Sequence, residues 1–131
     1  MTHIEFYILF GAEHEDRLAY ARTLALKALA GNRSVHIHTA CAKDTRSLIS
    51  DFQHLDNADD LTIDHKGEPE SDSRLLINLA AEVPYFFSRF ETTCEVVHDE
   101  STAREMARER YRFYQERGYP LTHREVQAEL V

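Results

Sequence analysis

Short apolar runs alternate with segments of helical periodicity along most of this chain. Residues 4–10 (IEFYILF) suit a strand buried on both faces, and residues 15–30 repeat apolar side chains at helical spacing. Further strand-like runs occupy residues 34–39, 61–63, 74–79 and 94–98, and further helical segments occupy residues 43–55, 83–90 and 103–117. Helices between strands allow those strands to pair in parallel. We therefore predict a single three-layer α/β/α domain over residues 1–131, Rossmann-like, with a mostly parallel central sheet.

The turn after the first expected strand argues against a nucleotide-binding loop. Residues 11–16 (GAEHED) contain one glycine, Gly11, and match neither GxGxxG nor GxxxxGK[ST]. The sequence also lacks a GxSxG elbow and an HExxH pair. We therefore expect no catalytic residue and no cofactor.

Composition limits the classes of partner and the cellular compartment that we expect for this protein. A net charge of −8 is unlike the basic face of a general nucleic-acid binder, so we expect no direct binding to nucleic acid. Cys41 and Cys94 form neither a disulfide framework nor a CxxC pair, which fits a reducing compartment. The chain begins directly with a strand-like run, and its apolar runs are too short to span a bilayer. These features predict a cytoplasmic protein without a membrane partner.

Two polar segments offer candidate metal ligands. His36 and His38 alternate with apolar residues and could bind a metal together with Cys41, but no second ligand pair follows. We expect them instead on the polar face of a strand. Residues 56–72 are strongly acidic, but DNADDLTID lacks the spacing of a calcium loop. We interpret this segment as an exposed loop around one short strand and predict no metal site.

The C-terminal helical segment carries the most informative pattern. Arg104, Arg108 and Arg112 recur at i, i+4 and i+8 and form one ridge, with Tyr111 beside it. Side chains able to pack against a core fall on another side: Ala103, Met106, Ala107, Arg110 and Tyr114. An arginine ridge with aromatic neighbours in an acidic protein indicates an anion-binding groove.

The sequence also predicts where this helix ends, and it allows a second interpretation of the charged face. Gly118 suits the left-handed residue that closes a helix, and Pro120 prevents the helix from resuming. Glu105 and Glu109 stand beside the arginines and could merely pair with them. The competing interpretation is therefore a solvated amphipathic helix face.

Several long runs resemble the chi subunit family of the bacterial DNA polymerase III holoenzyme. They are LLINLAAEVPYFFSRFETTCEVV and AREMARERYRFYQERGYPL, with support from the FYIL start and from SVHIHT after GNR. The resemblance implies a non-catalytic accessory protein of the clamp loader with a three-layer α/β/α fold. It also implies two protein partners, the psi subunit and the acidic C-terminal tail of single-stranded DNA-binding protein, which ends in an aromatic residue and a free carboxylate.

The resemblance assigns residues to the tail site by position. The basic residues would be Arg104, Arg108 and Arg112. The apolar part would be lined by Tyr111 and Leu121, with Val97 close by at the end of a strand.

The chain departs from the family pattern in its middle. Chi proteins usually have a leucine–tryptophan pair after the second helix and then Ser-Phe-(Leu/Val)-Pro-His. Here Leu55 takes the tryptophan position, and Thr62 begins a Thr-Ile-Asp-His run that ends at His65. These residues would lie on the psi-facing surface, so psi binding is either lost or uses a redesigned interface. A small nucleotide- or metal-dependent enzyme on a similar fold is the alternative function class.

Overall fold

The computed structural model describes residues 1–11, 13–56, 58–70 and 73–127. In chain order its strands are β1 (His3–Phe10), β2 (Val35–His38), β3 (Leu61–Asp64), β4 (Leu75–Asn78), β5 (Thr92–Val97) and β6 (Leu121–Gln127). Its helices are α1 (His14–Ala30), α2 (Ala42–Asp51) and α3 (Ser101–Glu116), with short 3-10 turns η1 (Ala58–Asp60) and η2 (Phe87–Arg89). The strands form one sheet in the order β3-β2-β4-β5-β1-β6, and all of the pairings are parallel.

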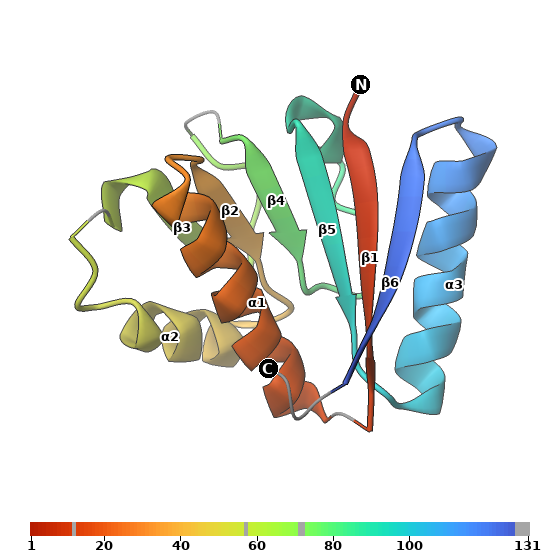
Figure 1. Cartoon of the computed structure of the whole chain (residues 1–131), viewed down its shortest axis with the longest axis horizontal. Coiled ribbons are helices and arrows are strands. Elements are labelled where there is room, and N and C mark those ends of the chain that lie inside the picture. Colours follow the sequence, from red (N-terminus) through yellow and green to blue (C-terminus); the bar gives the residue numbers. More distant parts are fainter. Residues whose placement is uncertain (12, 57, 71–72, 128–131) are drawn as a thin grey trace.

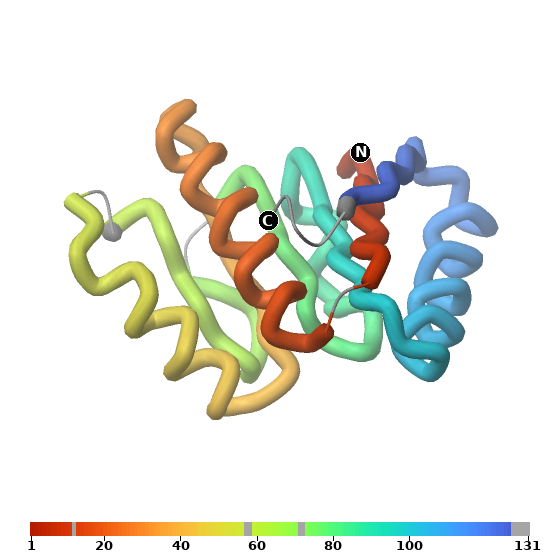
Figure 2. Tube along the Cα trace, turned by 60° about the horizontal axis from the view of Figure 1, so that its bottom comes forward, coloured from red at the N-terminus to blue at the C-terminus, as the bar shows by residue number. Residues whose placement is uncertain are grey.

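Helices cover both faces of the sheet. One core cluster joins α1 and α2 to the sheet, with buried residues such as Ala25, Leu48 and Ile77. The other joins α3 and the η2 segment to the opposite face, with residues such as Phe6 and Tyr114. Figure 1 shows α1 and α2 on one side of the strands, and Figure 2 shows α3 at the far end of the molecule from α2. The predicted three-layer α/β/α arrangement is confirmed.

The crossover from β5 to β6 determines where α3 lies. β1 sits between these two strands, with Ile4 opposite both Thr93 and Leu121. The chain must therefore pass over β1 on its way from β5 to β6, and α3 is the element that does so. As a result, α3 packs over β1 and β5 with one side open to solvent.

Three elements differ most from the sequence prediction. The second helix ends at Asp51 rather than at Leu55, and residues 83–90 contain only the short 3-10 turn η2. Strand β6 was not predicted, because its residues (LTHREVQ) are largely polar and follow Pro120. As an edge strand β6 pairs on one side only, with β1, so it does not need the apolar run of a central strand. Within the described residues, no helix is long and apolar enough to cross a membrane.

The placement of His36 corrects the prediction of a polar strand face. His36 is only 1% exposed, and its ring packs against Phe86 and Phe90 at centroid distances of 5.9 and 6.4 Å. Its Nδ1 is hydrogen-bonded to the Thr62 hydroxyl at 2.6 Å. The segment around η2 covers this face of the sheet, so His36 lies in the core and His38 is half-buried beside it. Alternation alone could not reveal this cover.

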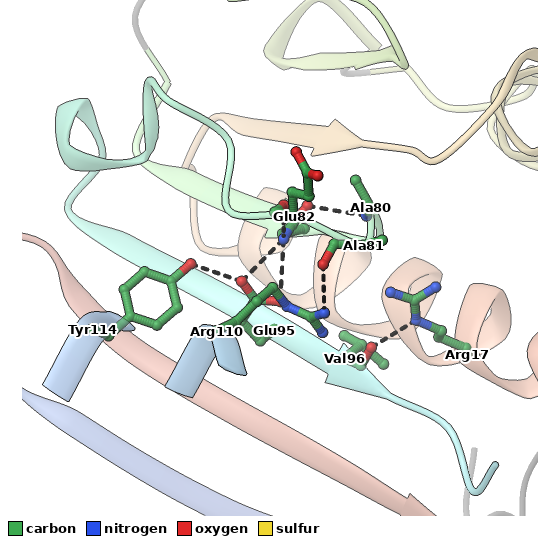
Figure 3. Close-up of polar contacts among 9 residues, drawn as sticks. Arg17, Ala80, Ala81, Glu82, Glu95, Val96, Arg110 and Tyr114 are labelled. Carbon is green, nitrogen blue, oxygen red and sulfur yellow. Dashed lines mark hydrogen bonds and ion pairs between the residues drawn. The ribbon is translucent and has the colours of Figure 1, made fainter. Parts of the chain in front are cut away.

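A buried carboxylate fixes α3 against the sheet. Glu95 of β5 is fully buried, and Arg110 Nε donates to its Oε1 at 2.9 Å while the Tyr114 hydroxyl donates to its Oε2 at 2.7 Å. Asn78 Nδ2 donates to both oxygens at 3.2 and 3.0 Å. Arg110 Nη1 also donates to the Ala81 carbonyl at 2.9 Å, as Figure 3 shows. The network therefore ties β4, β5, the loop after β4 and α3 together.

Removing Arg110 should destabilise the protein strongly. Arg110→Ala leaves the buried Glu95 carboxylate without its cation. Loss of one partner of a buried ion pair typically costs about 3–5 kcal/mol. Arg112→Ala is a matched control on the same helix, because Arg112 is exposed. Urea unfolding followed by circular dichroism measures both changes, and a loss below about 1 kcal/mol for Arg110→Ala would contradict the role given to the network.

His36 should make the fold sensitive to acid. Burial, with the neighbouring His38 as the second cause, lowers the pKa of His36 from 6.5 to about 4. Between those values the unfolded chain binds a proton that the folded chain does not, so the free energy of unfolding falls as the pH decreases. The slope for one such group is about 1.4 kcal/mol per pH unit.

The measurement is the free energy of unfolding between pH 7 and pH 4.5. His36→Asn should reduce its slope, whereas His54→Asn, at an exposed histidine, should leave the slope unchanged. An unchanged slope for His36→Asn would show that other groups carry the acid sensitivity.

Candidate partner-binding groove

The first and last turns of α3 are well defined. The Glu100 carboxylate accepts hydrogen bonds from the amides of Thr102 and Ala103 at 3.0 and 2.9 Å, and these bonds lower the pKa of Glu100. At the other end Gly118 has a φ of 76°, as predicted for a residue that closes a helix. The Tyr119 amide donates to the Tyr114 carbonyl at 3.2 Å there. The arginine ridge therefore stands on a helix that is capped at both ends.

A cavity opens on the side of α3 that faces β1. Arg110 and Tyr114 point into the network around Glu95, which turns Ala107 towards the sheet, where it is 6% exposed. Because alanine is small, it leaves room between the helix and the strands. The cavity has a volume of about 170 Å3, and its other lining residues are Phe6, Ile8, Val97, Arg104, Arg108 and Tyr111. We call it the α3 groove.

The floor of the α3 groove is apolar and one wall is aromatic. Phe6 and Ile8 come from β1, and Val97 comes from the end of β5. The ring of Tyr111 meets Phe6 edge to face, with centroids 5.2 Å apart. This contact orients Tyr111 as a rigid wall, which suits an apolar or aromatic group entering the groove.

The two arginines of the groove differ in their contacts. Arg104 Nη1 lies 3.4 Å from Asp99 Oδ1, and its guanidinium lies 5.3 Å from the centroid of the Phe10 ring. Arg108 is exposed and, within the described residues, has no ion pair. A guanidinium offers planar paired donors that match a carboxylate. The groove therefore combines one free cation and one already paired cation with an apolar floor.

The structure brings together four of the six residues expected at the tail site. Val97, Arg104, Arg108 and Tyr111 line the α3 groove. Arg112 is exposed one turn further along α3, and Leu121 is half-buried at the start of β6, where it packs with the core beneath α3. These two residues do not line the cavity.

The three residues expected on the psi-facing surface do not share one face of the sheet. Leu55 packs with the cluster beneath α1 and α2. Thr62 is hydrogen-bonded to His36, whose ring packs with Phe86 on the opposite face. His65 follows β3, and its Nδ1 lies 3.2 Å from the Thr45 hydroxyl. A partner that contacts all three would have to wrap around the β3 edge.

Sequence reasoning missed several residues of the groove. Phe6 and Ile8 were assigned to a buried strand without a preferred face, although their spacing puts them on the same face. Asp99 and Phe10, the partners of Arg104, gave no signal, because their approach depends on how β1 and β5 end beside α3. Among the described residues no group of three or more His, Cys, Asp or Glu side chains is placed to bind a metal.

Comparison with known sequences identifies the family. A family model described as DNA polymerase III chi subunit, HolC, matches residues 48–122, which is more than half of the chain and includes all of α3. DNA polymerase III subunit chi of Pseudomonas aeruginosa is 34% identical over an alignment covering 92% of this chain and 94% of that protein. The chain belongs to the DNA polymerase III chi subunit family.

Chi family membership confirms the resemblance drawn from the sequence motifs. The matched span begins within α2 and ends at Thr122, so it contains the Glu95 network and most of the α3 groove. The alignment with the Pseudomonas aeruginosa chi subunit extends over nearly the whole chain. The Glu95 network and the α3 side of the groove therefore lie within the part of the chain that the family model matches.

Proposed function

We propose that this protein is a non-catalytic accessory subunit of the DNA polymerase III clamp loader, acting in the cytoplasm. In this proposal it links the replicase to single-stranded DNA-binding protein by binding that protein's acidic C-terminal tail. The observation that carries the proposal is the α3 groove, where an apolar floor is walled by Arg104, Arg108 and Tyr111. Membership of the chi family supplies the setting.

The chemistry of the groove suits such a tail. A peptide that ends in phenylalanine brings one ring and a terminal carboxylate next to it, with further carboxylates upstream. The ring would enter the cavity over Phe6 and Val97 beside Tyr111. The terminal carboxylate of the peptide would bind the exposed Arg108, and the acidic residues upstream would reach Arg112 one turn along the helix. The ring and the charge would thus be read together.

Contact with the psi subunit is a second part of the proposal. The surface around β3 carries Leu55 where the family pattern has tryptophan and Thr62 where it has phenylalanine, while His65 stands at the position of the family's histidine. Thr62 and His65 are also engaged in hydrogen bonds within the protein. We propose that psi binds here through a redesigned interface or with reduced affinity, because large aromatic anchors usually dominate interface energy.

Arg108→Ala should weaken tail binding about ten- to a hundredfold. A hydrogen bond to a charged group contributes about 1.5–3 kcal/mol, and 1.4 kcal/mol corresponds to a factor of ten. Arg108→Lys should recover part of the affinity, since lysine keeps the charge but loses the paired donors. The measurement is fluorescence anisotropy of a labelled peptide ending in Asp-Asp-Ile-Pro-Phe.

The controls distinguish binding in the groove from general charge attraction, and the proposed function from that of an enzyme. Arg46→Ala removes an exposed arginine from α2, in a different layer, and should leave the affinity unchanged. A peptide without its terminal phenylalanine should bind about as poorly as the Arg108→Ala variant does. Equal affinities for wild type, Arg108→Ala and Arg46→Ala would place tail binding elsewhere. Nucleotide binding or turnover in the absence of peptide would favour the enzyme alternative.

Consider a psi subunit whose own chi partner carries the family's tryptophan. Such a psi subunit should bind this chain weakly or not at all. The missing ring at Leu55 and the threonine at position 62 remove the large contacts on this side. Size-exclusion chromatography of a mixture with such a psi tests this expectation, and Leu55→Trp should increase complex formation. A stable one-to-one complex with the wild-type chain would show that the substitutions are compensated.

A further inference from the structure

A second cavity lies on the other side of α3, at the carboxyl ends of the central strands. It has a volume of about 190 Å3 and is lined by residues including Arg17, Leu79, Val97, His98, Met106 and Arg110. It is separate from the α3 groove, with which it shares only the lining residue Val97. We call it the switch-point cavity.

The name follows from the topology. β2 and β4 are neighbours in the sheet, but the chain leaves β2 through α2 towards β3 and leaves β4 in the opposite direction towards β5. In open α/β sheets, ligands bind outside the carboxyl ends of the strands where the connections diverge in this way. The cavity is lined by Ala40, just after β2, and by Leu79 and Ala81, just after β4.

Arg17 is a buried cation without a carboxylate partner. It is 8% exposed, and its Nε donates to the Val96 carbonyl at 2.6 Å. Figure 3 shows this bond, with the two terminal nitrogens of the guanidinium beyond it. Across the described residues no ion pair forms at Arg17, and no hydrogen bond reaches its terminal nitrogens. Such a charge is costly to bury unless an anion compensates it.

The surroundings of Arg17 compensate its charge only in part. Arg110 lines the same cavity, but its charge is already compensated by Glu95. Burial, with Arg110 as the second cause, lowers the pKa of Arg17 from its ordinary value to about 10, although the carboxylates of Glu95 and Asp44 act in the opposite direction. His98 lines the cavity as well, and its Nδ1 is buried without a hydrogen-bond partner among the described residues. One cation is therefore available to a ligand, and one ring nitrogen of a lining residue has no hydrogen-bond partner among the described residues.

Size and charge define the class of ligand. The cavity is smaller than the roughly 300–1,000 Å3 typical of pockets for drug-sized ligands, so a nucleotide would not fit. Leu79, Val97 and Met106 make part of its wall apolar. The Glu100 carboxylate also lines it and disfavours a ligand with two negative charges. A monoanion with a short apolar stem meets all three conditions.

We propose that the switch-point cavity binds a small carboxylic acid in its ionised form, held by the terminal nitrogens of Arg17. The planar guanidinium would donate hydrogen bonds to both carboxylate oxygens, and the apolar stem would lie against Met106 and Leu79. The amides of α3 do not contribute, because Glu100 already caps Thr102 and Ala103. This site goes beyond the proposed function and does not depend on it.

The test is a titration of the protein with sodium propionate at constant ionic strength, followed by nuclear magnetic resonance. Saturable shifts of the Arg17 Nε–H and His98 ring signals are expected, with sodium chloride as the blank. Arg17→Met should weaken propionate binding about ten- to a hundredfold. Arg46→Met, on the exposed side of α2, should leave it unchanged.

Two further arms keep the outcome decisive. Ala103→Leu fills the cavity without changing the Arg17 bond to Val96, so it should abolish the saturable shifts even if Arg17→Met does not fold. It should leave affinity for the tail peptide unchanged, because Ala103 does not line the α3 groove. Sodium phosphate should bind more weakly than propionate. The proposal is overturned by the absence of saturable shifts in the wild type, by unchanged binding in Ala103→Leu, or by phosphate binding as tightly as propionate.

Discussion

The buried Glu95 carboxylate determines where α3 lies, and much of the molecule's surface follows from that position. Arg110 and Tyr114 reach it from α3, while Asn78 reaches it from β4. Because all of these groups are buried, the helix cannot slide or rotate without leaving a charge or a polar group unpaired. Both cavities flank this helix, so the network also holds the α3 side of each cavity in place.

Small residues on α3 explain why the helix carries a cavity on each side. Ala107 faces β1 and Ala103 faces the carboxyl ends of β4 and β5. With long side chains at these positions, the gaps between helix and sheet would be filled by packing. The network around Glu95 holds the helix in place instead, which leaves two openings of different chemistry. One is flanked by surface arginines and the other contains a buried arginine.

The sequence predicted the layers and the arginine ridge but not the surroundings of either. Alternating runs indicated a parallel sheet, and helical spacing put Arg104 and Arg108 on one side of a capped helix. Strand β6 was not predicted, because an edge strand can be polar. The burial of His36 depends on a distant segment that covers it, and no local pattern reports this. Arg17 looked like an ordinary helix residue, because its isolation arises only where β5 ends beside α1.

Asp99 gives Arg104 a partner before any ligand arrives. Its Oδ2 accepts from the Gly11 amide at 2.9 Å, and its Oδ1 lies 3.4 Å from Arg104 Nη1, which connects the turn after β1 to the first turns of α3. A carboxylate that reaches Arg104 must therefore exchange with one already in place, whereas at Arg108 it meets an exposed cation. Long-range attraction to the groove thus depends chiefly on Arg108. Displacement of Asp99 would break its hydrogen bond with the Gly11 amide. Binding of a ligand in the groove would then be coupled to the backbone at Gly11, at the end of β1.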